Sequence, residues 1–270
     1  MKIAVTGGGG FIGKATVLEA EAQGHEAWSF DHHDGNDIMD SLDLLKGADC
    51  VIHLAGVLGT HELFNTVQAA IDLNITGAYR VMDWCLHNEA NYVGITMPDE
   101  FPSIYTATKI ASQRLATALH HSRGLRVSHV RAFNAYGPGQ KYGPGHPQKI
   151  VPTFSALAWK QVPLPIWGDG NQSVDLIHVN DVARVLVAAT GLTENQIIDA
   201  GTGTALTVNQ VADFILQVTA SAGGVEHRAM RDGETPTQIR AMGEGWEYLS
   251  KPPVFLWSQL AETVRWYRGR

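Results

Sequence analysis

The first thirteen residues of the chain, Met1 to Gly13, place the strongest constraint on its fold. An apolar run over residues 2–6 predicts a buried strand, and the spacing of apolar residues predicts a helix over 11–23. The consecutive glycines at 7–10 permit a tight turn and a close approach of the backbone to a ligand. Because backbone N–H groups at a helix start bind anions, this segment predicts a dinucleotide pyrophosphate site. A plain strand-to-helix turn is the alternative interpretation.

An acidic residue ends the next predicted strand. Residues 26–30 form that strand, and Asp31 follows it, eighteen positions after Gly13. A carboxylate at about this offset accepts hydrogen bonds from the adenosine ribose and repels a 2′-phosphate, which favours NAD over NADP. His32 and His33 come next, and any positive charge on them weakens this preference. We therefore predict a nucleotide-binding fold that takes NAD.

Composition narrows the class of protein. The formal net charge of −7 disfavours a nucleic-acid partner, and no apolar stretch is long enough to cross a membrane. Met1 leads directly into a strand, so we expect no signal peptide and a cytoplasmic location. The two cysteines, Cys50 and Cys85, lie far apart, as suits a reducing compartment. The twelve histidines include no HExxH pattern, and we expect no metal site.

Strand and helix signals alternate along the first half of the chain. Any third strand after Asp31 is short or missing, and residues 134–139 predict a loop. Beyond about residue 140 the alternation becomes irregular, and residues 220–245 are polar and rich in glycine. The remaining predicted strands are 49–54, 92–96, 127–133, 176–179 and 197–203, and the predicted helices are 64–87, 105–121, 151–160, 181–190, 207–219 and 257–267.

This order predicts an α/β fold with a Rossmann-type, doubly wound parallel sheet and a smaller C-terminal substrate-binding lobe. We assign residues 1–140 to an NAD-binding domain, to which residues 176–202 contribute strand and helix elements. Residues 141–270 form mainly the substrate-binding lobe, set over the carboxyl edge of the sheet where ligands of such folds bind.

Tyr105 and Lys109 form a second chemical group. Residues four apart share a face of a helix, so the Lys109 ammonium is expected beside the Tyr105 phenol. A nearby cation favours the phenolate, which then removes the proton of an alcohol while hydride leaves the same carbon for a nicotinamide. On its own this spacing is commonplace. Behind a dinucleotide site it predicts a catalytic pair.

With these residues in place, the chain resembles an extended short-chain dehydrogenase/reductase of the NAD-dependent epimerase/dehydratase family, which acts on nucleotide sugars. The resemblance rests on the glycine turn, on His53-Leu54-Ala55-Gly56, on Asn74 with Gly77, and on the Tyr105–Lys109 pair. It implies that the cofactor contacts are Gly7, Gly10, Phe11, Ile12, Gly13, Asp31, Asp37, Ile38, Leu54, Ala55, Gly56, Asn74 and Lys109.

The resemblance extends to the substrate side. Residues 131–139 and 164–170 resemble the family's diphosphate loop and base-binding segment, and 175–181 and 199–203 match two further signatures. These likenesses imply that Asn134 contacts the diphosphate and that Trp167 lies against a nucleobase. The implied substrate contacts are Asn134, Val151, Trp167 and Arg231.

The chain departs from the family pattern in two places. The tyrosine usually follows a Ser/Thr cluster by some two dozen residues, whereas Tyr105 follows Thr96 by nine, with Met97-Pro98 where hydroxyls are expected. Thr96 is the candidate hydroxyl that polarises the substrate oxygen, with packing or capping as its alternative. Val174 stands where an arginine usually binds the nucleotide phosphates, and Arg231 is either a phosphate contact or a surface arginine.

The resemblance implies an NAD-dependent nucleotide-sugar epimerase, similar to UDP-glucose 4-epimerases, that works through a transient 4-keto sugar. A UDP-sugar is the favoured substrate, and a homodimer through helices 64–87 and 105–121 is expected. A 4,6-dehydratase is an alternative, since Asp99-Glu100 lies close after Thr96. A catalytically impaired NAD- or nucleotide-binding module is the other, because the loop is short and Thr96 and Val174 are atypical.

Overall fold

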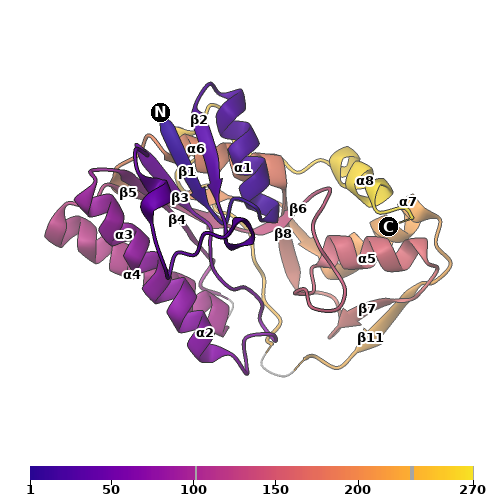
Figure 1. The fold of residues 1–270 in the computed structure, drawn as a ribbon. Helices are drawn as coiled ribbons and strands as arrows, with labels where there is room; N and C mark the ends of the chain where they lie inside the picture. The colour runs from indigo at the N-terminus through magenta and orange to yellow at the C-terminus, as the bar shows by residue number, and fades with distance from the viewer. Residues whose placement is uncertain (101, 232–233, 270) are drawn as a thin grey trace.

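The computed structural model describes residues 1–100, 102–231 and 234–269, which form two lobes (Figure 1). The larger lobe contains a six-stranded, wholly parallel sheet in the order β2-β1-β3-β4-β5-β9, which confirms the predicted Rossmann-type α/β fold. The strands are β1 (Lys2–Thr6), β2 (Glu26–Phe30), β3 (Cys50–His53), β4 (Asn91–Thr96), β5 (Val127–Ala132) and β9 (Glu194–Ala200).

Helices cover both faces of this sheet (Figure 1). Side chains alternate along each strand, so Ile3 and Val5 pack toward one face and Ala4 toward the other. The first face is covered by α1 (Phe11–Ala22) and α6 (Val179–Ala189), and the second by α3 (Ala78–His87) and α4 (Ile104–Arg123). Between β2 and β3 the chain forms the 3-10 turns His32–Asp34 and Asp43–Leu45 in place of a strand, as predicted.

The predicted helix 64–87 is interrupted. It consists of α2 (Val67–Ile71), a π-helical turn (Asp72–Gly77) and α3. Within the wide turn the buried Asn74 accepts a hydrogen bond from Val57 N and donates to Val57 O, both at 3.0 Å, and donates to Thr108 Oγ1 of α4. Asn74 therefore ties the loop after β3 to the helix that carries Tyr105.

The smaller lobe contains two short sheets, with strand orders β10-β8-β6 and β11-β7. The predicted loop at 134–139 was wrong in its first half, because residues 134–136 form a strand that pairs in parallel with β8. The elements of this lobe are β6 (Asn134–Tyr136), β7 (Leu164–Trp167), β8 (Ser173–His178), β10 (Ala205–Thr207), β11 (Val225–Arg228), α5 (Ile150–Trp159), α7 (Val208–Thr219), the 3-10 turn Trp246–Tyr248 and α8 (Trp257–Trp266).

The helices α5, α7 and α8 pack with β7 and β8 around a core that is separate from the two cores of the larger lobe. In chain order α6 and β9 return to the larger lobe after β8, so the connection crosses between the lobes. Among the described residues, no helix is both long enough and apolar enough to span a lipid bilayer.

Two fully buried carboxylates bind the backbone of one segment in the C-terminal part of the chain. Asp175 on β8 accepts hydrogen bonds from the backbone N–H groups of Thr202, Gly203 and Ala241, each at 2.8 Å. Asp199 on β9 accepts one from Arg131 Nε at 2.8 Å and three from the backbone of residues 242–244. Segment 241–244 is therefore held by one acid from each lobe.

We expect Asp175→Asn to lower the free energy of unfolding by roughly 2–4 kcal/mol, because an amide nitrogen would face backbone donors in a buried site. Urea unfolding measures the change. The control is Asp213→Asn on α7, whose side chain is exposed and whose replacement should change stability little. Equal stability of the two variants would contradict the role given to Asp175.

Candidate active site

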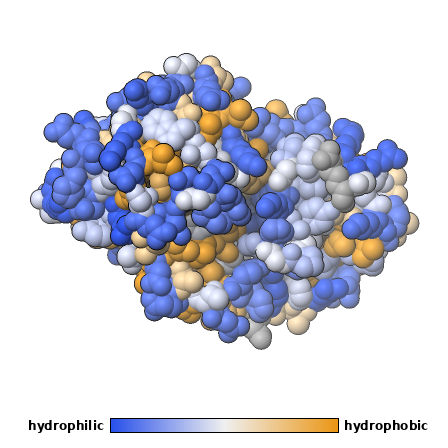
Figure 2. Space-filling model, in the orientation of Figure 1, coloured by the Kyte–Doolittle hydropathy of each residue, from blue (hydrophilic) through white to orange (hydrophobic). Residues whose placement is uncertain are grey.

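A cavity of about 1550 Å³ lies between the lobes, and Figure 2 shows the surface hollowed there. Single-ligand pockets usually have about 300–1,000 Å³, so this cavity has room for a cofactor and a second ligand. Thr96, Asn74 and Lys109 are not part of its wall. The predicted site residues that line it are Gly7, Gly10, Phe11, Ile12, Gly13, Asp31, Asp37, Ile38, Leu54, Ala55, Gly56, Tyr105, Asn134, Val151, Trp167 and Arg231.

The glycine turn brings α1 against the end of β1. Gly7 has φ of +72°, a conformation that favours glycine, and a Cβ on Gly13 would lie 2.1 Å from the Gly7 carbonyl oxygen. The helix begins after Gly10 without a side-chain cap and without an acidic residue in its first turn. Its free N–H groups at the cavity wall fit the pyrophosphate of a dinucleotide.

Asp31 lies beside this turn and is 5% exposed. Its carboxylate accepts hydrogen bonds from Gly9 N at 2.9 Å and from His33 N at 3.0 Å. Asp37 and the buried Ile38 follow on the same wall. These residues place a carboxylate and an apolar side chain next to the pyrophosphate position, as the nucleoside of a dinucleotide requires.

Behind the end of β3, the backbone of Gly56 lies against the side chains of Asn74 and Lys109. Gly56 has φ of +153°, and a Cβ there would lie 2.4 Å from Asn74 Oδ1 and 3.4 Å from Lys109 Nζ. Leu54, Ala55 and Gly56 face the cavity, while Asn74 and Lys109 lie directly behind Gly56 and are buried. The Lys109 ammonium thus lies behind the cavity wall, separated from the cavity only by backbone.

The acid–base properties of the Tyr105–Lys109 pair differ from the sequence prediction. Burial raises the pKa of Tyr105 to about 12 and lowers the pKa of Lys109 to about 8. The expected lowering of the phenol pKa by the neighbouring cation was therefore wrong for the protein without ligands, because desolvation of the phenolate dominates. The Tyr105 phenol of the protein without ligands is therefore harder to ionise than a phenol in water.

Thr96 does not line the cavity, and its hydroxyl bonds to α4. Thr96 is 1% exposed, and its Oγ1 donates a hydrogen bond to Gln113 Oε1 of α4 at 2.6 Å. Ser103, which the sequence analysis did not select, lines the cavity beside Tyr105. It caps α4 by accepting a hydrogen bond from Thr106 N at 3.0 Å. Its position two residues before Tyr105, just ahead of a helix, was the signal available in the sequence.

On the opposite wall, two arginines lie near the ring of Trp167. The guanidinium carbons of Arg228 and Arg231 are 5.6 and 5.4 Å from the centre of its ring. Arg231 lines the cavity and forms an ion pair with Glu234. Val174 is 8% exposed and packs into the core of the smaller lobe while lining the cavity.

Lys149 is a further cation of the cavity wall that sequence analysis missed. It immediately precedes α5, whose first turn contains Val151 and has no side-chain cap. Burial lowers the pKa of Lys149, and Glu62 opposes this shift. A lysine at a predicted helix start, close in sequence to Val151, was a signal for it. The wall that contains Val174, where the family pattern has an arginine, thus also contains Lys149 and Arg231.

We expect Lys109→Met to raise the unfolding free energy of the cofactor-free protein at pH 7. The fall in pKa from 10.5 to about 8 reflects a desolvation cost of roughly 3 kcal/mol for the charged lysine. From about pH 8 to 10.5 the unfolded chain keeps the proton that folded Lys109 has lost, so wild-type stability rises and the difference shrinks.

Thermal unfolding at pH 7 and pH 9.5 measures this difference. The control is Lys160→Met, which replaces an exposed lysine and should shift neither melting temperature appreciably. A Lys109→Met protein that is less stable than wild type at pH 7 would contradict the desolvation cost.

Comparison with known proteins identifies the family of the chain. A profile of the NAD dependent epimerase/dehydratase family matches residues 3–201. The chain is 26% identical over 326 residues to a dTDP-glucose 4,6-dehydratase of Streptomyces niveus, covering 99% of this chain and 93% of the relative. It is 25% identical over 235 residues to a UDP-glucuronate 4-epimerase of Thermodesulfobacterium geofontis, covering 80% of this chain and 71% of that protein.

Among solved structures, MoeE5 in complex with UDP-glucose and NAD superposes with a TM-score of 0.85. The two chains share 26% sequence identity, and the match covers 99% of each. The chain therefore belongs to the NAD-dependent epimerase/dehydratase family, a family of nucleotide-sugar enzymes whose cofactor is NAD.

Proposed function

We propose that this protein is an NAD-dependent nucleotide-sugar 4-epimerase, with a UDP-sugar as the favoured substrate. The observation that carries the proposal is that one cavity is lined by the glycine turn, by Tyr105, and by Trp167 with Arg231. A nucleotide cofactor, a proton acceptor and a site for a second nucleotide are thereby brought into reach of one another.

The proposed NAD site follows the wall of the larger lobe. The N–H groups at the start of α1 bind the pyrophosphate, and Asp31 accepts hydrogen bonds from the adenosine ribose. Asp37 and Ile38 contact the adenine, and Ala55-Gly56 forms the wall at the other end. When bound, NAD supplies a reversible hydride acceptor, so that the sugar passes through a 4-keto form.

Tyr105 acts as the acid–base residue of the proposed reaction. It accepts the proton of the sugar 4-hydroxyl as the 4-keto sugar forms, and it returns the proton after the sugar has turned over. When bound, the oxidised cofactor would bring a positive charge that favours the phenolate of Tyr105 against the raised pKa of the free protein. Lys109 is buried behind Gly56 and does not line the cavity, so we expect it to support Tyr105 from behind the wall without contacting the sugar.

The smaller lobe binds the nucleotide part of the substrate. Trp167 stacks on the base, and Asn134 and Val151 contact the substrate near the diphosphate. Arg231 and Lys149 supply the positive charge that the family arginine at position 174 would provide. The presence of two other cations on this wall supports a functional diphosphate site despite Val174, and argues against an impaired module.

Exposure of the acid pair favours epimerisation over dehydration. A 4,6-dehydratase of this family requires acidic side chains beside the reacting sugar, whereas Asp99 and Glu100 are exposed and neither lines the cavity. The dehydratases among the relatives keep dehydration as the alternative outcome of the substrate test.

A cytoplasmic homodimer that pairs through α2, α3 and α4 completes the proposal, supported by the exposed apolar side chains of Val67 and Ile71 on α2.

The function is tested by mass spectrometry. The purified protein should release NAD on mild denaturation and convert one of a panel of UDP-, GDP- and dTDP-sugars into an isomer of unchanged mass. Loss of one water would identify a dehydratase, and bound NAD with every sugar unchanged would support the impaired module.

Tyr105→Phe should abolish turnover and leave NAD release intact, so an active Tyr105→Phe protein would contradict the mechanism.

We further propose that Ser103, which lines the cavity, polarises the sugar oxygen in place of Thr96. In the protein without ligands its Oγ donates a hydrogen bond to Thr106 Oγ1 at 3.1 Å, and this hydroxyl turns toward the substrate when the sugar binds. Ser103→Gly should lower kcat by at least about tenfold while costing only a few tenths of a kcal/mol in helix capping, since glycine is an acceptable cap. Ser103→Thr should restore most of the rate. Thr96→Val removes the bond to Gln113 and should affect stability more than kcat. A larger loss of kcat in Thr96→Val than in Ser103→Gly would return the role to Thr96.

A further inference from the structure

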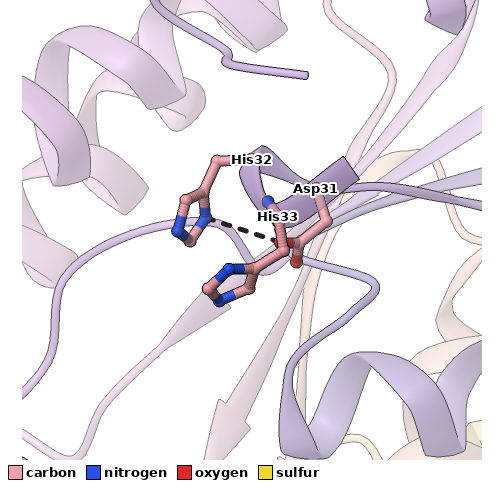
Figure 3. A group of neighbouring side chains, drawn as sticks. All are labelled: Asp31, His32 and His33. Atoms are coloured by element: carbon pink, nitrogen blue, oxygen red, sulfur yellow. Dashed lines mark hydrogen bonds and ion pairs between the residues drawn. The ribbon is translucent and has the colours of Figure 1, made fainter. Parts of the chain in front are cut away.

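The turn after β2 brings an acid and two imidazoles together. Asp31 caps the 3-10 turn His32–Asp34, and Gly35, with φ of +82°, ends it. This tight turn places the ring centres of His32 and His33 3.9 Å apart. Figure 3 shows the two rings and the Asp31 carboxylate gathered at this turn, with His32 directed at the carboxylate. We call these three residues the Asp-His-His cluster.

The ligand atoms of the Asp-His-His cluster are close enough for one metal ion. His32 Nδ1 lies 3.4 Å from Asp31 Oδ1, and one ligand atom from each residue lies within 4.8 Å of the others. Ligand atoms of a tetrahedral zinc site, about 2.0–2.2 Å from the ion, are about 3.3–3.6 Å apart. The Asp31–His32 pair already has this separation, and the exposed imidazoles must move closer by up to roughly 1 Å to complete the site.

The carboxylate is the fixed member of the Asp-His-His cluster. Asp31 is 5% exposed, and its oxygens accept hydrogen bonds from Gly9 N and His33 N. Such outer partners orient a metal-binding carboxylate. Two imidazole nitrogens with one carboxylate oxygen suit zinc and similar transition metals, whereas magnesium prefers oxygen ligands alone.

We propose that the Asp-His-His cluster binds one divalent transition-metal ion of the zinc class, and that this ion and NAD exclude each other. The three residues line the cavity at its glycine turn, where Asp31 is proposed to bind the adenosine ribose. An ion on Oδ1 removes an acceptor from the ribose hydroxyls and brings both imidazoles across the same side of the carboxylate. Free zinc ions therefore act as an inhibitor through the cofactor site, a property beyond the proposed epimerase activity.

Exclusion has a quantitative consequence. When two ligands compete for one site, each raises the apparent dissociation constant of the other, so the effect is reciprocal. The apparent Kd for NAD should rise in proportion to the free Zn²⁺ concentration, by about tenfold at nine times the Zn²⁺ dissociation constant. Saturating NAD should in turn suppress Zn²⁺ binding.

The test uses the full chain without an affinity tag, freed of NAD and treated with a chelator. Titration calorimetry with Zn²⁺ measures stoichiometry, and a second titration measures NAD affinity with and without Zn²⁺ or Mg²⁺. The variant is His32→Asn with His33→Asn, which keeps the backbone donor to Asp31. The matched control is His87→Asn, because His87 Nδ1 also lies 3.4 Å from a carboxylate, that of Asp83, without a second imidazole.

We expect one Zn²⁺ per chain in wild type and in His87→Asn, at least a tenfold loss of Zn²⁺ affinity in the double variant, and no competition from Mg²⁺. Zinc binding that is unchanged in the double variant would overturn the site. Zinc binding that leaves NAD affinity unchanged would overturn the exclusion. A protein that takes up no NAD would refute the proposed function and the exclusion together, while Zn²⁺ titration of the double variant would still decide the metal site.

Discussion

The contact between Gly13 and the carbonyl oxygen of Gly7 determines where the rest of the cavity lies. No side chain fits between them, because a Cβ on Gly13 would lie 2.1 Å from that oxygen. The contact holds the first turn of α1 against the end of β1, so the free N–H groups of the helix face the cavity. Asp31 is attached to the same turn through Gly9 N. The position of the cofactor wall therefore follows from backbone packing and requires no charged side chain other than Asp31.

The opposite wall is built differently. Arg231 lies on a segment that starts from β11, which pairs with β7, and returns to the fold at Thr237, whose carbonyl oxygen accepts from Ser173 N. Beyond it, Asp175 and Asp199 bind the backbone of 241–244. Buried carboxylates that accept several backbone donors are strong local anchors, since an unpaired donor or acid in the interior is costly. The segment that carries Arg231 is thus anchored to the smaller lobe at both of its ends.

The sheet of the larger lobe was predictable from sequence because each of its strands is a compact apolar run followed by a turn or helix signal. The same logic brought Asp31, Gly56 and Tyr105 to one cavity, since the carboxyl ends of parallel strands meet at one edge. The strands β6, β7, β10 and β11 have only three or four residues, too few for an alternating pattern, and they form because a partner strand is available.

Two features of the candidate site were beyond sequence reasoning for a different reason. The direction of the Thr96 hydroxyl depends on Gln113, which α4 brings alongside β4 through tertiary packing. The raised pKa of Tyr105 depends on burial by residues distant in sequence, whereas the spacing to Lys109 reveals only the neighbouring charge. The spacing of residues in a motif predicts which groups lie close together, whereas their burial in the folded protein sets their pKa values.

The short connection between β4 and α4 has a consequence for how the proposed reaction proceeds. The bond from Thr96 to Gln113 ties the middle of α4 to the end of β4, and the Ser103 cap closes the first turn of the helix. Asn74 ties Thr108 of α4 to the loop after β3. These contacts hold the helix that carries Tyr105 against the sheet. In the proposed epimerisation, inversion at carbon 4 would then come from rotation of the sugar ring about its bonds to the diphosphate, while Tyr105 keeps its place.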